Sequence, residues 1–127
     1  MTDRDRAFEI EIVPEDNLII ERIYGTWTMD TVTEYQAAWK NAARGLSARK
    51  ERLCLTNLTS SSIQPQNVSE AIIAAIDEPL LASSKVAIVT NSATMNLQAK
   101  RVAGKRNAQV FSSEAEALNW LRTDRSS

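Results

Sequence analysis

The stretch Val110-Phe-Ser-Ser-Glu-Ala-Glu-Ala-Leu-Asn-Trp-Leu121 decides the fold class of this chain. Its first residues end a short apolar run that is typical of a buried strand, and Ser113 with Glu116 forms a Ser-x-x-Glu capping box. Apolar side chains then recur at helical spacing up to Trp120 and Leu121. A strand that leads directly into an amphipathic helix predicts an α/β domain.

Upstream of this unit, strand-like and helix-like segments alternate along the chain. Short apolar or alternating runs predict strands, and apolar residues at three- and four-residue spacing predict helices. The predicted strands are residues 8–13, 18–24, 53–58, 86–90 and 108–111. The predicted helices are residues 29–44, 66–82 and 95–104, followed by the closing helix.

The order ββαβαβαβα predicts a single-domain α/β fold with a mixed sheet flanked by helices. The turn cluster at residues 14–17 joins the first two strands as an antiparallel hairpin. The remaining strands alternate with helices, which favours parallel pairing through right-handed crossovers. We expect one domain over residues 7–122, with flexible tails at 1–6 and 123–127.

Composition excludes several functional classes. The chain has 127 residues, of which 43% are hydrophobic and 24% charged, and a formal net charge of −1, so no overall field attracts nucleic acid. The longest apolar runs are far shorter than the ~20 residues of a membrane-spanning helix. The start of the chain lacks a secretory signal and Cys54 is the single cysteine, which together predict a cytoplasmic location.

The chain contains no histidine, so catalysis by Ser-His-Asp or Cys-His groups is excluded within it. Neither a metal site nor a cofactor site is indicated, because one cysteine and no histidine cannot form a ligand cluster and no glycine-rich loop is present. No pattern places two carboxylates in one cleft. We therefore expect a protein that is not an enzyme.

Four segments resemble the SpoIIAA-like group of STAS (sulfate transporter and anti-sigma antagonist) domains. They are Tyr24-Gly-Thr-Trp-Thr-Met-Asp30, Leu53-Cys-Leu-Thr-Asn-Leu58, Lys85-Val-Ala-Ile-Val-Thr90 and the closing stretch from Val110 to Leu121. The resemblance covers residues 7 to 122. It implies a small cytoplasmic module without catalytic activity, which regulates by binding a partner protein.

The resemblance also implies a switch by phosphorylation of a serine at the start of the second helix. In the family this serine lies in an Asp-Ser-Ser-Gly run, eight residues after an Asp/Asn-Leu pair. Here Asn57-Leu58 matches the pair, but the counted positions read Pro65-Gln-Asn-Val68. The usual switch is therefore not expected, and Ser62 and Ser69 are the nearest candidates for modification.

The helix predicted over residues 66–82 is unusually apolar. Ile72 and Ile73 are adjacent, so one of them points away from any narrow apolar stripe, and Pro79 breaks the helical pattern. One interpretation is a mobile lid over an apolar pocket. The architecture also resembles the CRAL-TRIO lipid-binding domains, and this resemblance implies an enclosed lipid or other apolar ligand. The other interpretation is a wide stripe that faces the core. The predicted ligand-binding residues are Trp27, Trp39, Ile72, Ile73, Ile76 and Leu80.

Two polar segments are candidates for contact with anions. Lys100, Arg101, Lys105 and Arg106 surround the end of the third predicted helix, where they suit anionic lipid headgroups or simply a solvated helix end. The run of hydroxyls at residues 59–62 follows a strand, at the edge where α/β sheets often bind ligands. A plain polar loop is the alternative there.

Two functional hypotheses follow. The first is a non-catalytic module that binds an apolar small molecule or lipid, with peripheral membrane contact through the mobile helix 66–82. The second is a protein-binding regulator of the anti-sigma-antagonist type. The uncovered edge strand at residues 8–13 also invites a homodimer, which Glu9 and Glu11 on that strand would oppose.

Overall fold

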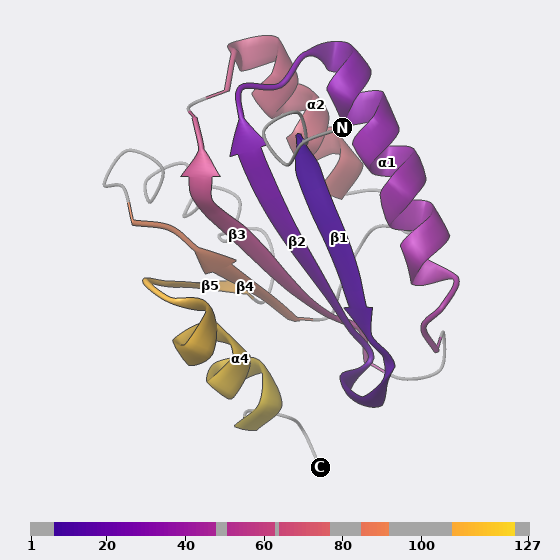
Figure 1. Ribbon diagram of the computed structural model, residues 1–127, viewed down its shortest axis with the longest axis vertical. Coiled ribbons are helices and arrows are strands. Elements are labelled where there is room, and N and C mark those ends of the chain that lie inside the picture. The colour runs from indigo at the N-terminus through magenta and orange to yellow at the C-terminus, as the bar shows by residue number, and fades with distance from the viewer. Residues whose placement is uncertain (1–6, 48–50, 63, 77–84, 92–107, 124–127) are drawn as a thin grey trace.

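The computed structural model describes residues 7–47, 51–62, 64–76, 85–91 and 108–123 (Figure 1). Its strands are β1 (Phe8–Val13), β2 (Leu18–Gly25), β3 (Leu53–Ser61), β4 (Lys85–Val89) and β5 (Ala108–Phe111). Its helices are the short 3-10 turn Pro14–Asp16 and α1 (Met29–Ala43), α2 (Gln66–Ile76) and α4 (Glu114–Thr123). The helix predicted over residues 95–104 lies outside the described residues.

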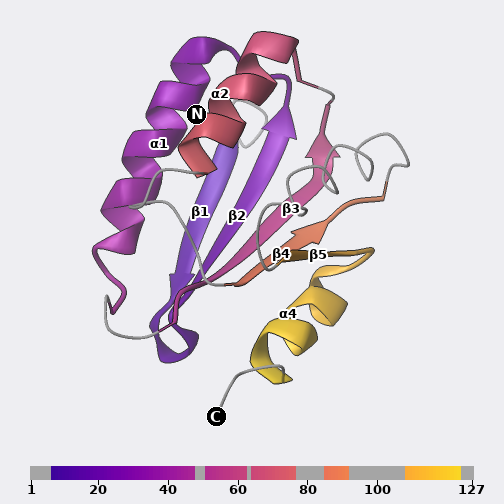
Figure 2. The ribbon, with the colours of Figure 1, turned by 180° about the vertical axis from the view of Figure 1, so that it is seen from behind.

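The described strands form one sheet in the order β1-β2-β3-β4-β5. β1 pairs with β2 in antiparallel fashion, and the pairs β2–β3, β3–β4 and β4–β5 are parallel. α1 and α2 pack against each other on one side of the sheet, and α4 lies on the other side (Figures 1 and 2). The predicted mixed α/β fold is confirmed.

Strand alternation divides the core into two layers. On the α1/α2 side, β2 and β4 contribute Ile19, Ile23 and Ile88, which pack with buried residues of α1. On the α4 side, their neighbours in sequence pack against Ala117 and Leu121, which are fully buried. Both sides of β4 and of the first three residues of β3 are therefore buried, as the sequence pattern predicted for these two strands.

The first hairpin is fixed by Asn17. This residue has a φ of 51°, a left-handed conformation that asparagine tolerates, and it is 2% exposed. Its Nδ2 donates to the carbonyl oxygens of Ser47 and Glu51 at 3.1 Å each, and its Oδ1 accepts from the Ser47 amide at 2.7 Å. One side chain thus ties the hairpin to the segments around the loop that follows α1.

The first and the last of the described α-helices, α1 and α4, both begin with a side-chain cap. Thr28 and Thr31 form a reciprocal capping box at the start of α1. At α4 the predicted cap is confirmed: Ser113 Oγ accepts from the Glu116 amide at 3.2 Å, and the Glu116 carboxylate accepts from the hydroxyls of Ser112 and Ser113. No helix among the described residues is long and apolar enough to cross a membrane.

The last turn of α4 contacts a buried cation. Lys85 begins β4 and is 2% exposed, with Nζ lying 4.2 Å from the centroid of the Trp120 ring and donating to the Trp120 carbonyl oxygen at 3.3 Å. A cation at this end complements the helix dipole. Trp120 is half-buried and also packs on Phe111, with 5.5 Å between ring centroids.

Candidate functional site

The carboxyl ends of β2 and β3 meet at one edge of the sheet, where each strand leads toward a helix. We call residues 25–28, 60–62 and 64–66 the loop edge. Gly25 begins it with a φ of +64°, the left-handed region that favours glycine. Ligands of open α/β sheets commonly bind at this edge, so its geometry decides what the fold offers for recognition.

The two halves of the loop edge are joined by Gln64. Its Oε1 accepts from the Trp27 amide at 2.7 Å, and its Nε2 donates to the Gly25 carbonyl at 3.0 Å and to Ser61 Oγ at 3.1 Å. The Ser62 amide also donates to the Gly25 carbonyl at 3.0 Å. The contacts with Trp27 and Gly25 join segments more than 30 residues apart, so they order both connections together.

A bulge in β3 lies immediately before the loop edge. Arg22 pairs with Asn57 but Tyr24 pairs with Ser60, so one residue of β2 faces two residues of β3. Asn57 supports this bulge, because its Oδ1 accepts from the Thr59 amide at 2.9 Å and from Thr59 Oγ1 at 2.7 Å. Bulges re-aim the side chains that follow, and here these are Ser60 and Ser61.

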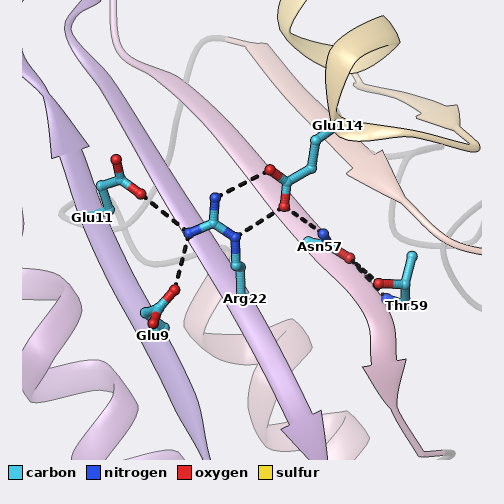
Figure 3. A network of polar contacts seen from close by, with 6 residues as sticks. All are labelled: Glu9, Glu11, Arg22, Asn57, Thr59 and Glu114. Carbon is cyan, nitrogen blue, oxygen red and sulfur yellow. Dashed lines mark hydrogen bonds and ion pairs between the residues drawn. The ribbon is translucent and has the colours of Figure 1, made fainter. Parts of the chain in front are cut away.

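A network of charges surrounds this bulge on the α4 side of the sheet (Figure 3). Arg22 holds Glu114 through two bonds, Nε to Oε2 at 3.0 Å and Nη2 to Oε1 at 3.1 Å. Its Nη1 donates to Glu9 at 3.0 Å and to Glu11 at 3.1 Å. Asn57 Nδ2 donates to Glu114 Oε2. The network therefore joins β1, β2, β3 and the first residue of α4.

The ion pair between Arg22 and Glu114 shifts the pKa values of both residues. Hydrogen bonding to Arg22 lowers the pKa of Glu114. Partial burial acts in the opposite direction, and the hydrogen bond from Asn57 lowers the pKa further. The hydrogen bond with Glu114 raises the pKa of Arg22. Glu114 is thus ionised at neutral pH and acts only as an acceptor.

A second carboxylate is buried on the α1/α2 side. Glu21 is 5% exposed, with Oε2 accepting from Tyr35 Oη at 2.7 Å and Oε1 accepting from Thr56 Oγ1 at 2.6 Å. Burial raises the pKa of Glu21, and hydrogen bonds from Thr56, Tyr35 and Trp39 counter that rise. Burial also raises the pKa of Tyr35. This cluster lies inside the core, where the Tyr35 ring packs on that of Trp27.

The exposed part of the loop edge consists of hydroxyls and amides together with Pro65. Its exposed residues are Thr26, Thr28, Ser60, Ser62, Pro65 and Gln66, and Ser61 is half-buried. Such groups donate and accept hydrogen bonds but do not supply an acid–base pair. Within the part of the chain that the structure describes, no group of His, Cys, Asp and Glu side chains could hold a metal ion. The geometry suits recognition.

The structure places both predicted pocket tryptophans in the core. Trp27 and Trp39 are each 2% exposed. Trp27 Nε1 donates to the Ala7 carbonyl at 3.0 Å, and its ring lies 5.1 Å from that of Tyr35. Both indoles therefore pack in the core, and ligand contact by either one stays a prediction.

The other predicted site residues are only partly placed. α2 carries Ile72, Ile73 and Ile76, whose side chains lie outside the described residues, as do Leu80 and the whole basic cluster Lys100, Arg101, Lys105 and Arg106. Ser62 is exposed at the loop edge, and Ser69 is half-buried in the first turn of α2. These assignments therefore stay predictions.

Three features of the site were not predicted from the sequence. Gln64 sits in a polar loop and carries no motif, and Arg22 meets Glu114 across 92 positions of sequence. Glu21 gave a weak signal, because it interrupts the apolar run of the strand predicted over residues 18–24. An acidic residue in such a run requires hydrogen-bond donors from other elements.

Comparisons with known proteins concern the fold. No protein-family model and no curated protein matches the chain. Among solved structures, an uncharacterized protein from Shewanella loihica PV-4 with a SpoIIAA-like fold is similar, with 19% sequence identity and a TM-score of 0.71. The match covers 91% of this chain and 92% of the Shewanella chain.

Two anti-sigma factor antagonists are also similar. SpoIIAA in its unphosphorylated form is 17% identical over 92% of this chain and 99% of its own, with a TM-score of 0.64. An anti-sigma factor antagonist from Mycobacterium paratuberculosis is 10% identical over 91% and 94%, with a TM-score of 0.62. The chain has a SpoIIAA-like fold, which confirms the resemblance predicted from the sequence.

Proposed function

We propose that this chain is a SpoIIAA-like regulatory module that binds a partner protein through its loop edge. The likeness to two anti-sigma factor antagonists over nine-tenths of the chain supports a regulatory role of this kind. The main structural support is the group of hydrogen bonds made by Gln64, which joins the β2–α1 and β3–α2 connections into one surface. No catalytic role is proposed.

An ordered polar surface favours binding because less conformational entropy is lost when a partner docks. Ser60 and Ser62 are exposed, and the Gly25 carbonyl beside them already accepts from the Ser62 amide and from Gln64 Nε2. A partner can therefore form hydrogen bonds with the exposed groups without unfolding either connection.

A phosphoserine at the start of α2 is not part of this proposal. Gln66, Asn67 and Val68 occupy the first positions of α2, and none carries a hydroxyl. The next residue, Ser69, is half-buried, and its amide donates to the Pro65 carbonyl at 2.9 Å. Ser62 is the more accessible candidate for modification, and its modification stays a prediction.

Affinity capture with matched variants tests the proposal. Full-length protein is immobilised as wild type, Ser60→Arg and Glu34→Arg, and proteins retained from the source cells are quantified by mass spectrometry. Both positions are exposed, but Glu34 lies on α1 away from the loop edge. We expect one protein to be retained by the wild type and Glu34→Arg and lost from Ser60→Arg, with the purified pair then binding in calorimetry. Equal retention by all three proteins would contradict the proposal.

An apolar or lipid-like ligand is the second function that the sequence predicts. The segment Gln66–Ile76 has one charged residue, Glu70, and it ends in three alanines and three isoleucines, which is the observation that favours this reading. Trp27 and Trp39 are held in core contacts, so a ligand reaching them would have to displace protein neighbours. Flotation with anionic vesicles and native mass spectrometry of protein from cells test it. Absence of both vesicle binding and co-purified lipid would remove it.

A further inference from the structure

We propose that Glu114, the first residue of α4, is a positioning residue for the loop edge, because through Asn57 it fixes the bulge of β3. Its importance for recognition rests on the proposed function, but the positioning itself does not. The inference follows from three consecutive contacts on the α4 side of the sheet (Figure 3).

The first contact fixes the Glu114 carboxylate. Arg22 binds it through Nε and Nη2 in a two-bond arrangement, which restricts both position and rotation. Arg22 is itself held by Glu9 and Glu11 of β1. The start of α4 is thus anchored to the sheet at one defined point.

The second contact fixes the orientation of the Asn57 amide. An ionised carboxylate only accepts hydrogen bonds, so Glu114 requires the nitrogen of the Asn57 side chain to face it. The oxygen then faces the opposite way, toward the amide and hydroxyl of Thr59, which both donate to it. If the side chain at position 114 could also donate a hydrogen bond, the Asn57 amide could adopt the flipped orientation, with its oxygen toward residue 114.

The third contact carries this orientation to the loop edge. The Thr59 amide is freed from the β2–β3 pairing by the bulge, and Asn57 satisfies it. The chain resumes pairing with Ser60 opposite Tyr24 and Ser61 opposite Gly25. Ser61 Oγ then accepts from Gln64, so the bulge and the surface that Gln64 orders are directly connected.

Nuclear magnetic resonance of the full chain tests the inference without any partner. Glu114→Gln keeps the size of the side chain but adds an NH₂ group that tolerates the flipped Asn57. Arg122→Gln is the matched control, because it removes the α4 ion pair with Asp16, 3.0 Å long, at the far end of the helix. We expect Glu114→Gln to shift the amides of Thr59, Ser60 and Ser61 and to speed exchange of the Thr59 amide about tenfold, the loss of one hydrogen bond.

A pH titration of the wild type gives a second readout. The Thr59 amide is expected to move below pH 4.5 together with the Glu114 carboxyl, and this movement is expected to be absent in Glu114→Gln. The charged groups facing Glu114 are Arg22, which stays protonated, and Glu9 and Glu11 beyond it. Glu116 lies in the same turn and bonds to Ser112 and Ser113, so the carboxyl resonances of all four glutamates are followed.

Asn57→Ala covers the case in which Glu114→Gln does not fold, because it removes the same link from its other side. It is expected to give the same shifts at Thr59 to Ser61, with no further change in the double variant. Equal shifts in Glu114→Gln and Arg122→Gln, or a Thr59 amide that ignores the Glu114 titration, would overturn the inference. Shifts as expected alongside a failed partner capture would leave the positioning intact and remove the proposed function.

Discussion

At the scale of single residues, two carboxylates of this chain have opposite environments. Glu21 is buried among neutral donors, and desolvation raises its pKa. Glu114 is bound by Arg22, and this hydrogen bonding lowers its pKa. A raised pKa means that the folded state binds the proton more tightly than the unfolded state, and a lowered pKa means the reverse. The two residues should therefore affect stability with opposite dependence on pH.

We predict that Glu21→Gln gains stability relative to the wild type as pH rises. Below pH 4.5 Glu21 is protonated in both folded and unfolded chains, so burial of its charge costs nothing there. The cost develops as pH rises through the folded pKa, and glutamine never incurs it. Urea unfolding of both proteins between pH 4.5 and 8 measures the difference. A difference that does not change with pH would contradict the prediction.

Truncation at the same position should behave differently. Glu21→Ala leaves the buried Tyr35 hydroxyl and the half-buried Thr56 hydroxyl without their carboxylate acceptor, at a cost of about 1–3 kcal/mol for the buried group. Comparison with Glu21→Gln in the same unfolding series separates the role of hydrogen bonding from that of charge.

For Glu114 the sign is reversed. The stability that its carboxylate contributes is present above pH 4.5 and is lost as pH falls through the lowered folded pKa. At pH 7 we predict that Glu114→Gln is less stable than the wild type by about 1–2 kcal/mol, a modest value because the pair is partly exposed. The gap should close in acid. Unfolding curves at pH 7 and pH 3 check this, and a gap that widens in acid would refute the assignment.

At the scale of elements, Gly25 shows how one backbone conformation links β2 to α1. Its φ of +64° is strained for side chains with a Cβ, yet a Cβ built there meets nothing within 4 Å. We therefore predict that Gly25→Ala costs about 1–2 kcal/mol from conformation alone, and that Gly25→Asn costs less because asparagine tolerates this region. Thermal unfolding of the two variants measures both. Equal costs would indicate that packing matters more than φ.

The elements themselves were largely predictable from the sequence. The Ser113–Glu116 cap, the helix beginning at Met29 and the buried run at β4 follow from local rules of capping and periodicity. β3 was predicted to end at Leu58 but runs to Ser61, because the bulge lets pairing resume beyond the apolar run. That extension depends on Asn57 and on a partner strand, which no local pattern contains.

The candidate site was much less predictable than the fold. The hydroxyl run was singled out, but Gln64 bonds to Trp27 across 37 positions and Arg22 bonds to Glu114 across 92. Such contacts are set by the order of strands in the sheet, and a single polar residue in a loop carries no periodic signal. Local sequence patterns therefore predict which residues are buried, while the polar network can be identified only once the order of the strands in the sheet is known.

At the scale of the whole molecule, the two sides of the sheet differ in the residues that they bury and in the helices that cover them. α1 and α2 cover an apolar layer that contains Trp27, Trp39 and the buried Glu21. On the other side, α4 covers β3, β4 and β5, and its first residue joins the polar network of Arg22 (Figures 1 and 3). The loop edge lies at the carboxyl ends of β2 and β3, where the chain leads into α1 and α2.

The central claim is that the loop edge contacts a partner protein, and site-specific photo-crosslinking inside the source cells tests it most directly. A photoreactive amino acid replaces exposed Ser60 in one protein and exposed Glu34 on α1 in another. We predict a discrete crosslinked protein from position 60 and none of that mass from position 34. Crosslinking of that protein from position 34 but not from position 60, or from neither, would contradict the claim.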